Sequence, residues 1–509
     1  MTKNKTLLGL LLLIIIIASF LRLYNITLLP PGLYPDEAMN GNNALEALSP
    51  NGNFKIFYPE NNGREGLFID IQAISIAIFG NTPWALRGVS AIFGILTVLG
   101  VYFLTRELFD EQPNTDNRQP TTNLKTSEII ALLSSFLIAT SFWHINFSRI
   151  GFRAITAPFY LTFALYFLLK AWRNKSYKWM ALAGFVFGLG LHSYIAYRAT
   201  PIIALIIFIY WFFKFKAERI ALIKRFVIFV ISAVISASPL LYYFVKNPQD
   251  FFGRTSQISV FSSLTPLKDL TLNILKTVGM FNFVGDQNWR HNFAGRPELF
   301  WPVGIMFIVG IVIGIYYLFK KKDTNEKTFI SGERLPFIIL FSWMVIASLP
   351  IVISNEGLPH SLRAIIMIPP VFILAGFGGV WIYQWATKYE IFTKIRKVLI
   401  PLLILLLFTE AYYTYFINWG MNQNTPGAFA QNYVDIGKVL NSQELKDYHK
   451  YVVVKAGGAL VRGIPMPSQT VMYITDTFTP EKQNKKDMHY VLSEDLIPKN
   501  TKNYIVFIE

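Results

Sequence analysis

Residues 7–21 read LLGLLLLIIIIASFL, an uninterrupted apolar run that decides the class of fold. With its flanks, this run reaches the length of about 20 residues that a helix needs to cross a hydrocarbon core of about 30 Å. Comparable runs lie at 226–245, 301–319 and 398–408 with its aromatic extension. Because backbone groups in lipid must bond to one another within the segment, these runs predict helices rather than strands.

The composition extends this conclusion to the whole chain. Of 509 residues, 53% are hydrophobic, which is too apolar for a soluble protein of this length. The net charge of +16 would also suit a nucleic-acid-binding protein, but the basic residues gather in short loops between apolar runs. We therefore exclude nucleic acid as a partner. The absence of cysteine excludes a disulfide framework, a thiolate nucleophile and a cysteine-based zinc site.

Helical runs and loop charges together predict the topology. Residues 1–20 resemble a signal peptide but lack a small-residue cleavage site, so we expect an uncleaved first helix. The loops on the side of the N-terminus carry 23 Lys and Arg in 74 residues, against 12 in 141 on the other side. The positive-inside rule then places the N-terminus in the cytoplasm and, with an odd number of helices, the C-terminus outside. We expect about eleven spans, at 7–23, 84–105, 127–143, 155–171, 178–194, 199–215, 224–245, 301–319, 335–353, 364–386 and 397–414.

Two regions outside the spans stand out. A transmembrane module, 1–416, contains large outside loops at 24–83 and 246–300, and loops of this length usually bind or catalyse. The apolar run 67–80 is short and carries Asp70, which favours an interfacial or re-entrant helix. The tail, 417–509, has strand-like runs at 451–455, 470–474 and 504–508, so we predict a small extracytoplasmic α/β domain.

The first outside loop contains a paired acid. Residues 28–38 read LLPPGLYPDEA, and the helix-like stretch 38–48 follows. Asp36 stands where an N-cap residue would stand, and capping alone would explain it. A carboxylate on a rigid turn just outside the membrane is also suited to act as a general base.

These residues resemble the opening of the polytopic glycosyltransferases with the C-type (GT-C) fold. The resemblance points to the protein-mannosyltransferase-like and aminoarabinose-transferase-like group, glycosyltransferase family 39 type, and covers about residues 7–386. It implies an all-α transmembrane bundle. In the aminoarabinose-transferase-like members a second acid lies in the loop corresponding to 144–154, which here contains none. The segments that carry the resemblance are Arg22 with Pro30-Pro31-Gly32, Asp36-Glu37-Ala38, Gly63–Leu67, Pro83–Arg87, Gly190–Tyr194 with Tyr197-Arg198 and Pro201, and Glu356–Arg363.

The resemblance implies transfer of a sugar from a polyprenyl-phosphate-linked donor to an acceptor on the outer face. It assigns the base to Asp36, with Glu37 as second acid. The leaving lipid phosphate is already acidic, so it needs positive charge rather than a general acid. Direct displacement would invert the anomeric centre.

The remaining candidate residues fall into two groups. Cations at outside helix ends could hold the donor phosphate, because arginine binds phosphate through two parallel hydrogen bonds, although such residues also anchor in lipid headgroups. Polar and aromatic side chains in the outside loops could contact sugar or acceptor. The phosphate candidates are Arg363, His360, Arg198, Arg153 and Arg149, and the sugar or acceptor candidates are Glu65, Asp286, Trp289, His291 and His192.

No pair of potential metal ligands has the i, i+4 spacing of a helical site, so we predict no metal site and no required cofactor. A divalent metal stays possible but unsupported. We expect a multi-pass protein of the plasma (inner) membrane whose partners are the lipid-linked donor, a lipid, glycan or protein acceptor, and the bilayer. The alternatives are a transporter or flippase of lipid-linked glycans, which would favour ionisable groups deep in the spans, and a structural subunit of an envelope-assembly complex.

Overall fold

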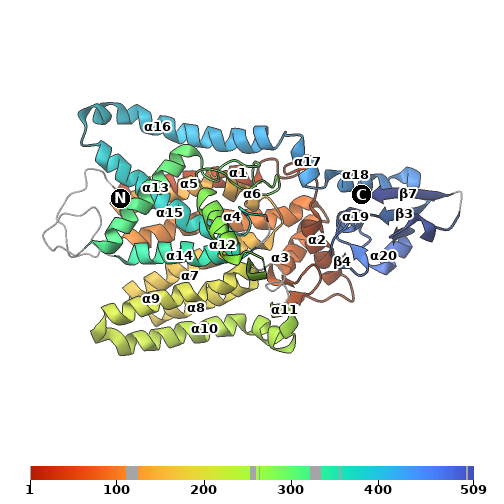
Figure 1. The fold of residues 1–509 in the computed structure, drawn as a ribbon, viewed down its shortest axis with the longest axis horizontal. Coiled ribbons are helices and arrows are strands. Elements are labelled where there is room, and N and C mark those ends of the chain that lie inside the picture. Colours follow the sequence, from red (N-terminus) through yellow and green to blue (C-terminus); the bar gives the residue numbers. More distant parts are fainter. Residues whose placement is uncertain are drawn as a thin grey trace.

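The computed structural model shows a bundle of long helices that lie side by side, with a small sheet-containing region at one end (Figure 1). The structure describes residues 2–110, 124–252, 260–262, 264–320, 334–354, 357–499 and 502–509. Each of the eleven predicted spans coincides with helix. The main helices are α1 Thr2–Leu23, α4 Pro83–Phe109, α5 Thr126–Ala139, α7 Thr156–Arg173, α8 Tyr177–Leu189, α9 Pro201–Lys214, α10 Arg219–Lys246, α13 Trp301–Phe319, α14 Leu335–Val352, α15 Ile368–Ala386 and α16 Glu390–Tyr412.

Fewer helices than predicted have the length and composition of a membrane span. Within the described residues, eight helices meet both conditions. A ninth span arises if α5 and α6 (Phe142–Ser148), which meet at an angle of 62°, count as one broken helix. The helix α8 has 13 residues, and α16 carries charges at both ends. By length and composition, the described residues therefore contain fewer membrane-spanning helices than the predicted eleven.

Close approach between helices depends on small residues. A Cβ atom on Gly310 of α13 would lie 2.0 Å from the carbonyl oxygen of Leu374 in α15. One on Gly378 of α15 would lie 2.0 Å from the carbonyl oxygen of Met306. These glycines let the two backbones touch, which is how transmembrane helices gain packing where lipid supplies no hydrophobic drive. As a result α15 is the most enclosed of the candidate spans.

The first outside loop folds into α2 (Pro35–Ala47), the two-residue strands β1 (Phe57–Tyr58) and β2 (Arg64–Glu65), and α3 (Leu67–Phe79). The short helix predicted at 67–80 is confirmed by α3. The helix α2 begins three residues earlier than predicted, with Tyr34 as its N-cap. Asp36 consequently lies in the first turn of α2 and is not the cap, because Pro35 supplies the first helical residue with its φ already fixed.

The chain end forms a three-stranded parallel sheet in the order β6-β3-β7. The strands are β3 His449–Val454, β6 Met488–Val491 and β7 Asn503–Ile508, and the predicted strands at 451–455 and 504–508 are confirmed. The third predicted strand, 470–474, is instead part of the helix α19 (Ser468–Thr475). Contacts with the first outside loop override its β-forming composition: Thr470 donates to the carbonyl of Leu33, just before α2, at 2.9 Å.

These contacts place the C-terminal region against the first outside loop, at the opposite end of the bundle from the N-terminus (Figure 1). Short helices α17 (Asn424–Ala428), α18 (Gln431–Leu440) and α20 (Pro480–Lys485) and the hairpin of β4 (Leu460–Val461) and β5 (Ile464–Pro465) complete this region. Both the first outside loop and the tail therefore lie at one end, as the predicted topology requires.

Candidate active site

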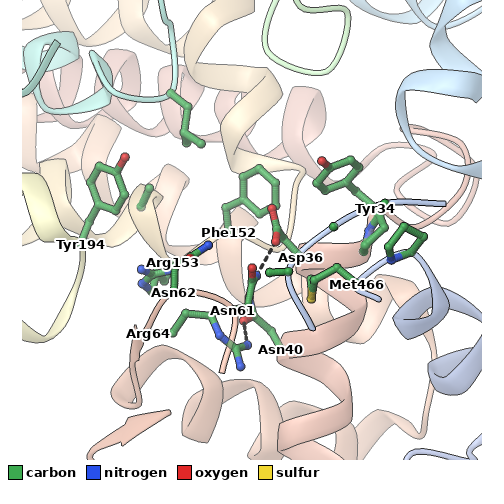
Figure 2. A pocket seen from close by; sticks show the side chains of 17 residues that line it. Tyr34, Asp36, Asn40, Asn61, Asn62, Arg64, Phe152, Arg153, Tyr194 and Met466 are labelled. Carbon is green, nitrogen blue, oxygen red and sulfur yellow. Dashed lines mark hydrogen bonds between the residues drawn. The ribbon is translucent and has the colours of Figure 1, made fainter. Parts of the chain in front are cut away.

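A cavity of about 380 Å³ lies where the first outside loop, the bundle end and the C-terminal region meet (Figure 2). Its wall mixes polar and aromatic side chains with exposed backbone from a C-terminal loop. Asp36 is the single carboxylate among the described residues that line it. The lining residues are Tyr34, Pro35, Asp36, Asn40, Asn61, Asn62, Arg64, Phe152, Arg153, Ala154, Tyr194, Leu362, Gly457, Gly458, Ala459, Met466 and Pro467.

A hydrogen bond from Asn61 fixes the orientation of the Asp36 carboxylate. Its Oδ1 accepts a hydrogen bond from Nδ2 of Asn61 at 2.5 Å. The turn that brings Asn61 back to α2 uses positive φ angles of 54° at Asn61, 62° at Asn62 and 81° at Gly63, which these residue types tolerate.

Two buried arginines fix the loop before α2. Arg87 donates to the carbonyl oxygens of Pro30 at 2.6 Å and Gly32 at 2.8 Å. Arg149, itself fully buried, donates to the carbonyls of Leu21 at 3.2 Å and Leu29 at 2.8 Å. Arg149 does not line the cavity, and its role as a phosphate ligand stays a prediction.

Glu37 follows Asp36 in sequence but points away from the cavity, since successive helical residues lie about 100° apart around the axis. It is completely buried. Its Oε2 accepts hydrogen bonds from Nε of Arg87 at 3.0 Å and from the backbone amide of Gly151 at 2.7 Å. Every one of these contacts is to residues outside the cavity wall, and the role of Glu37 as a second acid stays a prediction.

Arg64 and Arg153 bring positive charge to the cavity that holds Asp36 (Figure 2). Arg64 is 2% exposed, and it donates to Oδ1 of Asn40 at 2.7 Å and of Asn43 at 2.5 Å. Burial, and next the charge of Arg153, lower the pKa of Arg64 to about 10, and the charge of Asp36 acts in the opposite direction. The guanidinium therefore stays protonated at neutral pH.

Glu65 positions the second of these cations. Its Oε2 accepts from Nε of Arg153 at 2.8 Å, and its Oε1 accepts from Arg198 at 3.4 Å. Glu65 is buried and does not line the cavity. Arg198 does not line it either and donates to the carbonyl of Phe251 at 2.9 Å. Of the predicted phosphate ligands, Arg153 alone reaches the cavity that contains Asp36.

A second cluster brings together residues of the loops before α13 and before α15. Asp286 Oδ2 lies 3.0 Å from Nδ1 of His291 and 3.9 Å from Nδ1 of His360. Asp286 also accepts from the backbone amides of Asn288 at 2.8 Å and Ser361 at 2.9 Å. Hydrogen bonds with His291 lower the pKa of Asp286 although burial opposes this, and burial lowers the pKa of both histidines.

This cluster does not line the Asp36 cavity, so the structure does not bring His360, Asp286 and His291 together with Asp36. Their contacts with donor or acceptor stay predictions. Arg363 is also absent from the cavity wall and donates to Oγ of Ser354, while its neighbour Leu362 does line the wall. Glu356 of the same predicted motif lies outside the described residues.

The two remaining predicted sugar-contact residues also lie elsewhere. His192 is buried, with Nε2 3.1 Å from the carbonyl of Ser236. The Trp289 ring packs on Phe293, with 5.2 Å between the ring centroids. The neighbouring residue, Arg290, instead approaches the cavity, since its guanidinium carbon lies 3.6 Å from the ring centroid of Tyr34.

Sequence reasoning missed several residues of the site. Arg64 stands inside the motif Gly63–Leu67, but nothing in the motif distinguishes its side chain from that of Glu65. Asn61 lies in a turn-forming Asn-Asn-Gly sequence, which signalled a turn and not a contact. The wall formed by Gly457, Gly458 and Ala459 had no signal at all, because these residues carry no reactive group.

Known proteins share parts of this sequence. Residues 68–115 match the family described as dolichyl-phosphate-mannose-protein mannosyltransferase. A putative mannosyltransferase, YkcB, of Bacillus subtilis (strain 168) is 27% identical over 252 residues, which are 47% of this chain and 32% of the relative. The chain thus matches about a third of the length of that relative.

Solved structures match over nearly the whole chain. ArnT from Cupriavidus metallidurans in the apo state superposes with a TM-score of 0.55 at 13% identity, covering 96% of this chain and 90% of ArnT. The same enzyme bound to undecaprenyl phosphate gives 0.53 at 13% identity, covering 92% and 84%. The apo oligosaccharyltransferase of Archaeoglobus fulgidus gives 0.50 at 16% identity, covering 95% and 64%. The chain is therefore a polytopic membrane protein with the GT-C fold of membrane glycosyltransferases.

Proposed function

We propose that the protein transfers a sugar from a polyprenyl-phosphate-linked donor to an acceptor hydroxyl or amine on the non-cytoplasmic face of the plasma membrane. One observation carries this proposal: a single carboxylate, Asp36, shares the lining of one cavity with the cationic residues Arg64 and Arg153. Support comes from the GT-C fold, the mannosyltransferase family match and the undecaprenyl phosphate bound to the similar ArnT structure.

The proposed chemistry uses each of these groups once. Asp36 removes the proton of the acceptor as its oxygen or nitrogen attacks the anomeric carbon. The bond from that carbon to the phosphate oxygen breaks, and Arg153 and Arg64 stabilise the negative charge that develops on the lipid phosphate. Asn61 keeps the Asp36 carboxylate pointed into the cavity through its hydrogen bond.

The wall of the cavity also predicts the stereochemical outcome. A retaining mechanism needs a second carboxylate as nucleophile, about 5 Å from the first. Within the described residues, Asp36 is the single carboxylate on the wall, and Glu37 and Glu65 are bound to arginines behind it. We therefore propose a single displacement that inverts the anomeric centre. We also propose that the two guanidiniums supply the positive charge, so that transfer requires no metal in this cavity.

The position of the cavity favours an enzyme over a transporter. Substrate sites of secondary transporters lie near the bilayer midplane, at the interface of structural repeats. Here the lining of the cavity includes Gly457, Gly458 and Ala459 of the C-terminal region, and that region lies at one end of the bundle (Figure 1). The charge bias of the loops supports the proposal that this end faces outside the cell and that the N-terminus lies in the cytoplasm.

The test is a transfer assay with the full chain in lipid nanodiscs. Polyprenyl-phosphate hexoses, pentoses and amino sugars, each labelled in the sugar, are offered with lipid, glycan and peptide acceptors. We expect labelled product, free polyprenyl phosphate and an anomeric configuration opposite to that of the donor. Product with retained configuration would overturn the single-carboxylate chemistry. Movement of intact lipid-linked sugar across the bilayer, with no release of polyprenyl phosphate, would support the transporter instead.

A further inference from the structure

The buried cluster of Asp286, His291 and His360 has the composition and spacing of a metal site. The three side chains each offer one ligand atom, and these atoms lie within 4.8 Å of one another. Four ligands at about 2.1 Å around a tetrahedral zinc ion are separated by about 3.4 Å from one another. The measured separations of 3.0 Å and 3.9 Å from Asp286 Oδ2 to the two histidines lie on either side of that value.

Burial and hydrogen bonds fix the side chains of this cluster in place. Asp286 and His291 are both 3% exposed, and His360 is 15% exposed at its side chain. Asn146 fixes the backbone of the loop before α13 by donating to the carbonyls of Arg290 at 2.8 Å and His291 at 3.0 Å. The two imidazole rings stack with an interplanar angle of 30° and centroids 4.8 Å apart. The positions of the ligands are thus fixed by packing before any ion arrives.

Two buried polar atoms at the cluster have no hydrogen-bond partner in the structure. Nε2 of His291 is buried and has no hydrogen-bond partner, and Oε2 of the adjacent buried Glu298 has none either. Buried polar atoms without partners are uncommon in folded proteins.

We propose that Asp286, His291 and His360 bind one divalent transition-metal ion, with zinc as the expected species. Two imidazoles and a carboxylate suit zinc or a similar borderline ion, whereas magnesium and calcium prefer oxygen ligands. The guanidiniums of Arg290 and Arg363 act on His291 and oppose a cation, and the Asp286 carboxylate offsets them in part. We expect a site of moderate affinity.

The ion would join two loops that both reach the cavity wall. Asp286 and His291 belong to the loop whose Arg290 packs on Tyr34, and His360 precedes Leu362, which lines the cavity. Binding would therefore rigidify one side of the wall without entering it. This role is structural and is independent of the proposed transfer chemistry.

The test uses the full chain, purified with a tag that contains no histidine, stripped with a chelator and dialysed against zinc alone. We expect one zinc ion per chain by elemental analysis, a melting temperature that rises with zinc, and visible d–d bands when cobalt replaces zinc. Because removal of an outer-shell partner already weakens metal binding about 10–100-fold, His291→Asn and His360→Asn should weaken it by at least that much.

The matched control is the double variant His449→Asn with His489→Asn. These histidines flank Asp487 at the C-terminal sheet and are about 40% exposed. They offer the same residue types without burial. Zinc binding that survives in His360→Asn but disappears in the control would overturn the proposal, as would a stripped wild-type protein that takes up no zinc or cobalt. Chelation of the wild type needs no variant and so separates metal loss from misfolding.

Discussion

Replacing Glu37 by glutamine separates the structural role of this residue from a catalytic one. The side chains of Glu37 and Arg87 are 0% and 1% exposed, and Nε of Arg87 lies 3.0 Å from Oε2 of Glu37. Glutamine keeps the shape but removes the charge, which leaves the guanidinium of Arg87 buried and unpaired. Loss of one partner from a buried pair costs about 3–5 kcal/mol. The carbonyls of Pro30 and Gly32 still accept from Arg87, so we expect the lower end, about 3 kcal/mol.

The assay is unfolding in mixed micelles, with the same preparations tested for transfer. The control is Glu46→Gln, on the same helix. Glu46 pairs with Arg462 at 2.8 Å, but the two side chains are 24% and 37% exposed. An exposed pair contributes about 0–1 kcal/mol, so this variant should unfold almost like the wild type.

Two outcomes decide the role of Glu37. Destabilised Glu37→Gln protein whose folded fraction still transfers sugar would confirm the structural assignment. A variant that unfolds like the wild type and yet has lost transfer would refute it, and would restore Glu37 as a second acid in the chemistry.

Three further predictions follow from the cavity and its surroundings. Arg153→Ala should lower kcat/KM about 10–100-fold, because hydrogen bonds to charged groups contribute about 1.5–3 kcal/mol. The control Arg198→Ala removes the other partner of Glu65 and should lower kcat/KM far less. Equal losses in the two variants would contradict the placement of Arg153 on the cavity wall. Gly457→Trp should reduce transfer about 10²-fold or more, because a bulky ring on the cavity wall would displace the substrate. The melting temperature should stay unchanged, because a Cβ atom on Gly457 meets no atom within 4 Å. Unimpaired transfer would show that the substrate lies elsewhere. Burial raises the pKa of Asp70 to about 6 from its ordinary 3.8, so the folded state holds this proton more tightly than the unfolded chain does. The melting temperature should therefore fall as pH rises from about 4 to 6. If the same dependence of melting temperature on pH persists in Asp70→Asn, Asp70 is not its cause.

The sequence predicts the helices well because the signal for a span is local. An apolar run such as 7–21 forces a helix in lipid whatever its neighbours do, so all eleven predicted segments are helical in the structure. The exceptions are segments whose structure depends on distant partners. Residues 470–474 are rich in β-forming types, yet Thr470 and Tyr473 bond to the first outside loop and the segment is helical.

The site was predictable only in part, for a related reason. The Pro-Pro-Gly turn and the acid pair identify the loop, but they do not tell which acid faces the cavity. That choice depends on the rotation of α2, and Arg87, about fifty residues later, fixes it by binding Glu37. The cations show the same limit: Arg363 and Arg153 have similar positions at helix ends, and only Arg153 meets the cavity, because Glu65 holds it there.

The rate of transfer by Asp36→Asn tests the central claim most directly. The substitution keeps the size of the side chain and leaves Oδ1 able to accept from Asn61, so the melting temperature and donor affinity should match those of the wild type. A general base contributes about 10²–10⁴-fold, and we predict that the single-turnover rate in nanodiscs falls by that factor. A rate close to that of the wild type would contradict the assignment of Asp36 as the base.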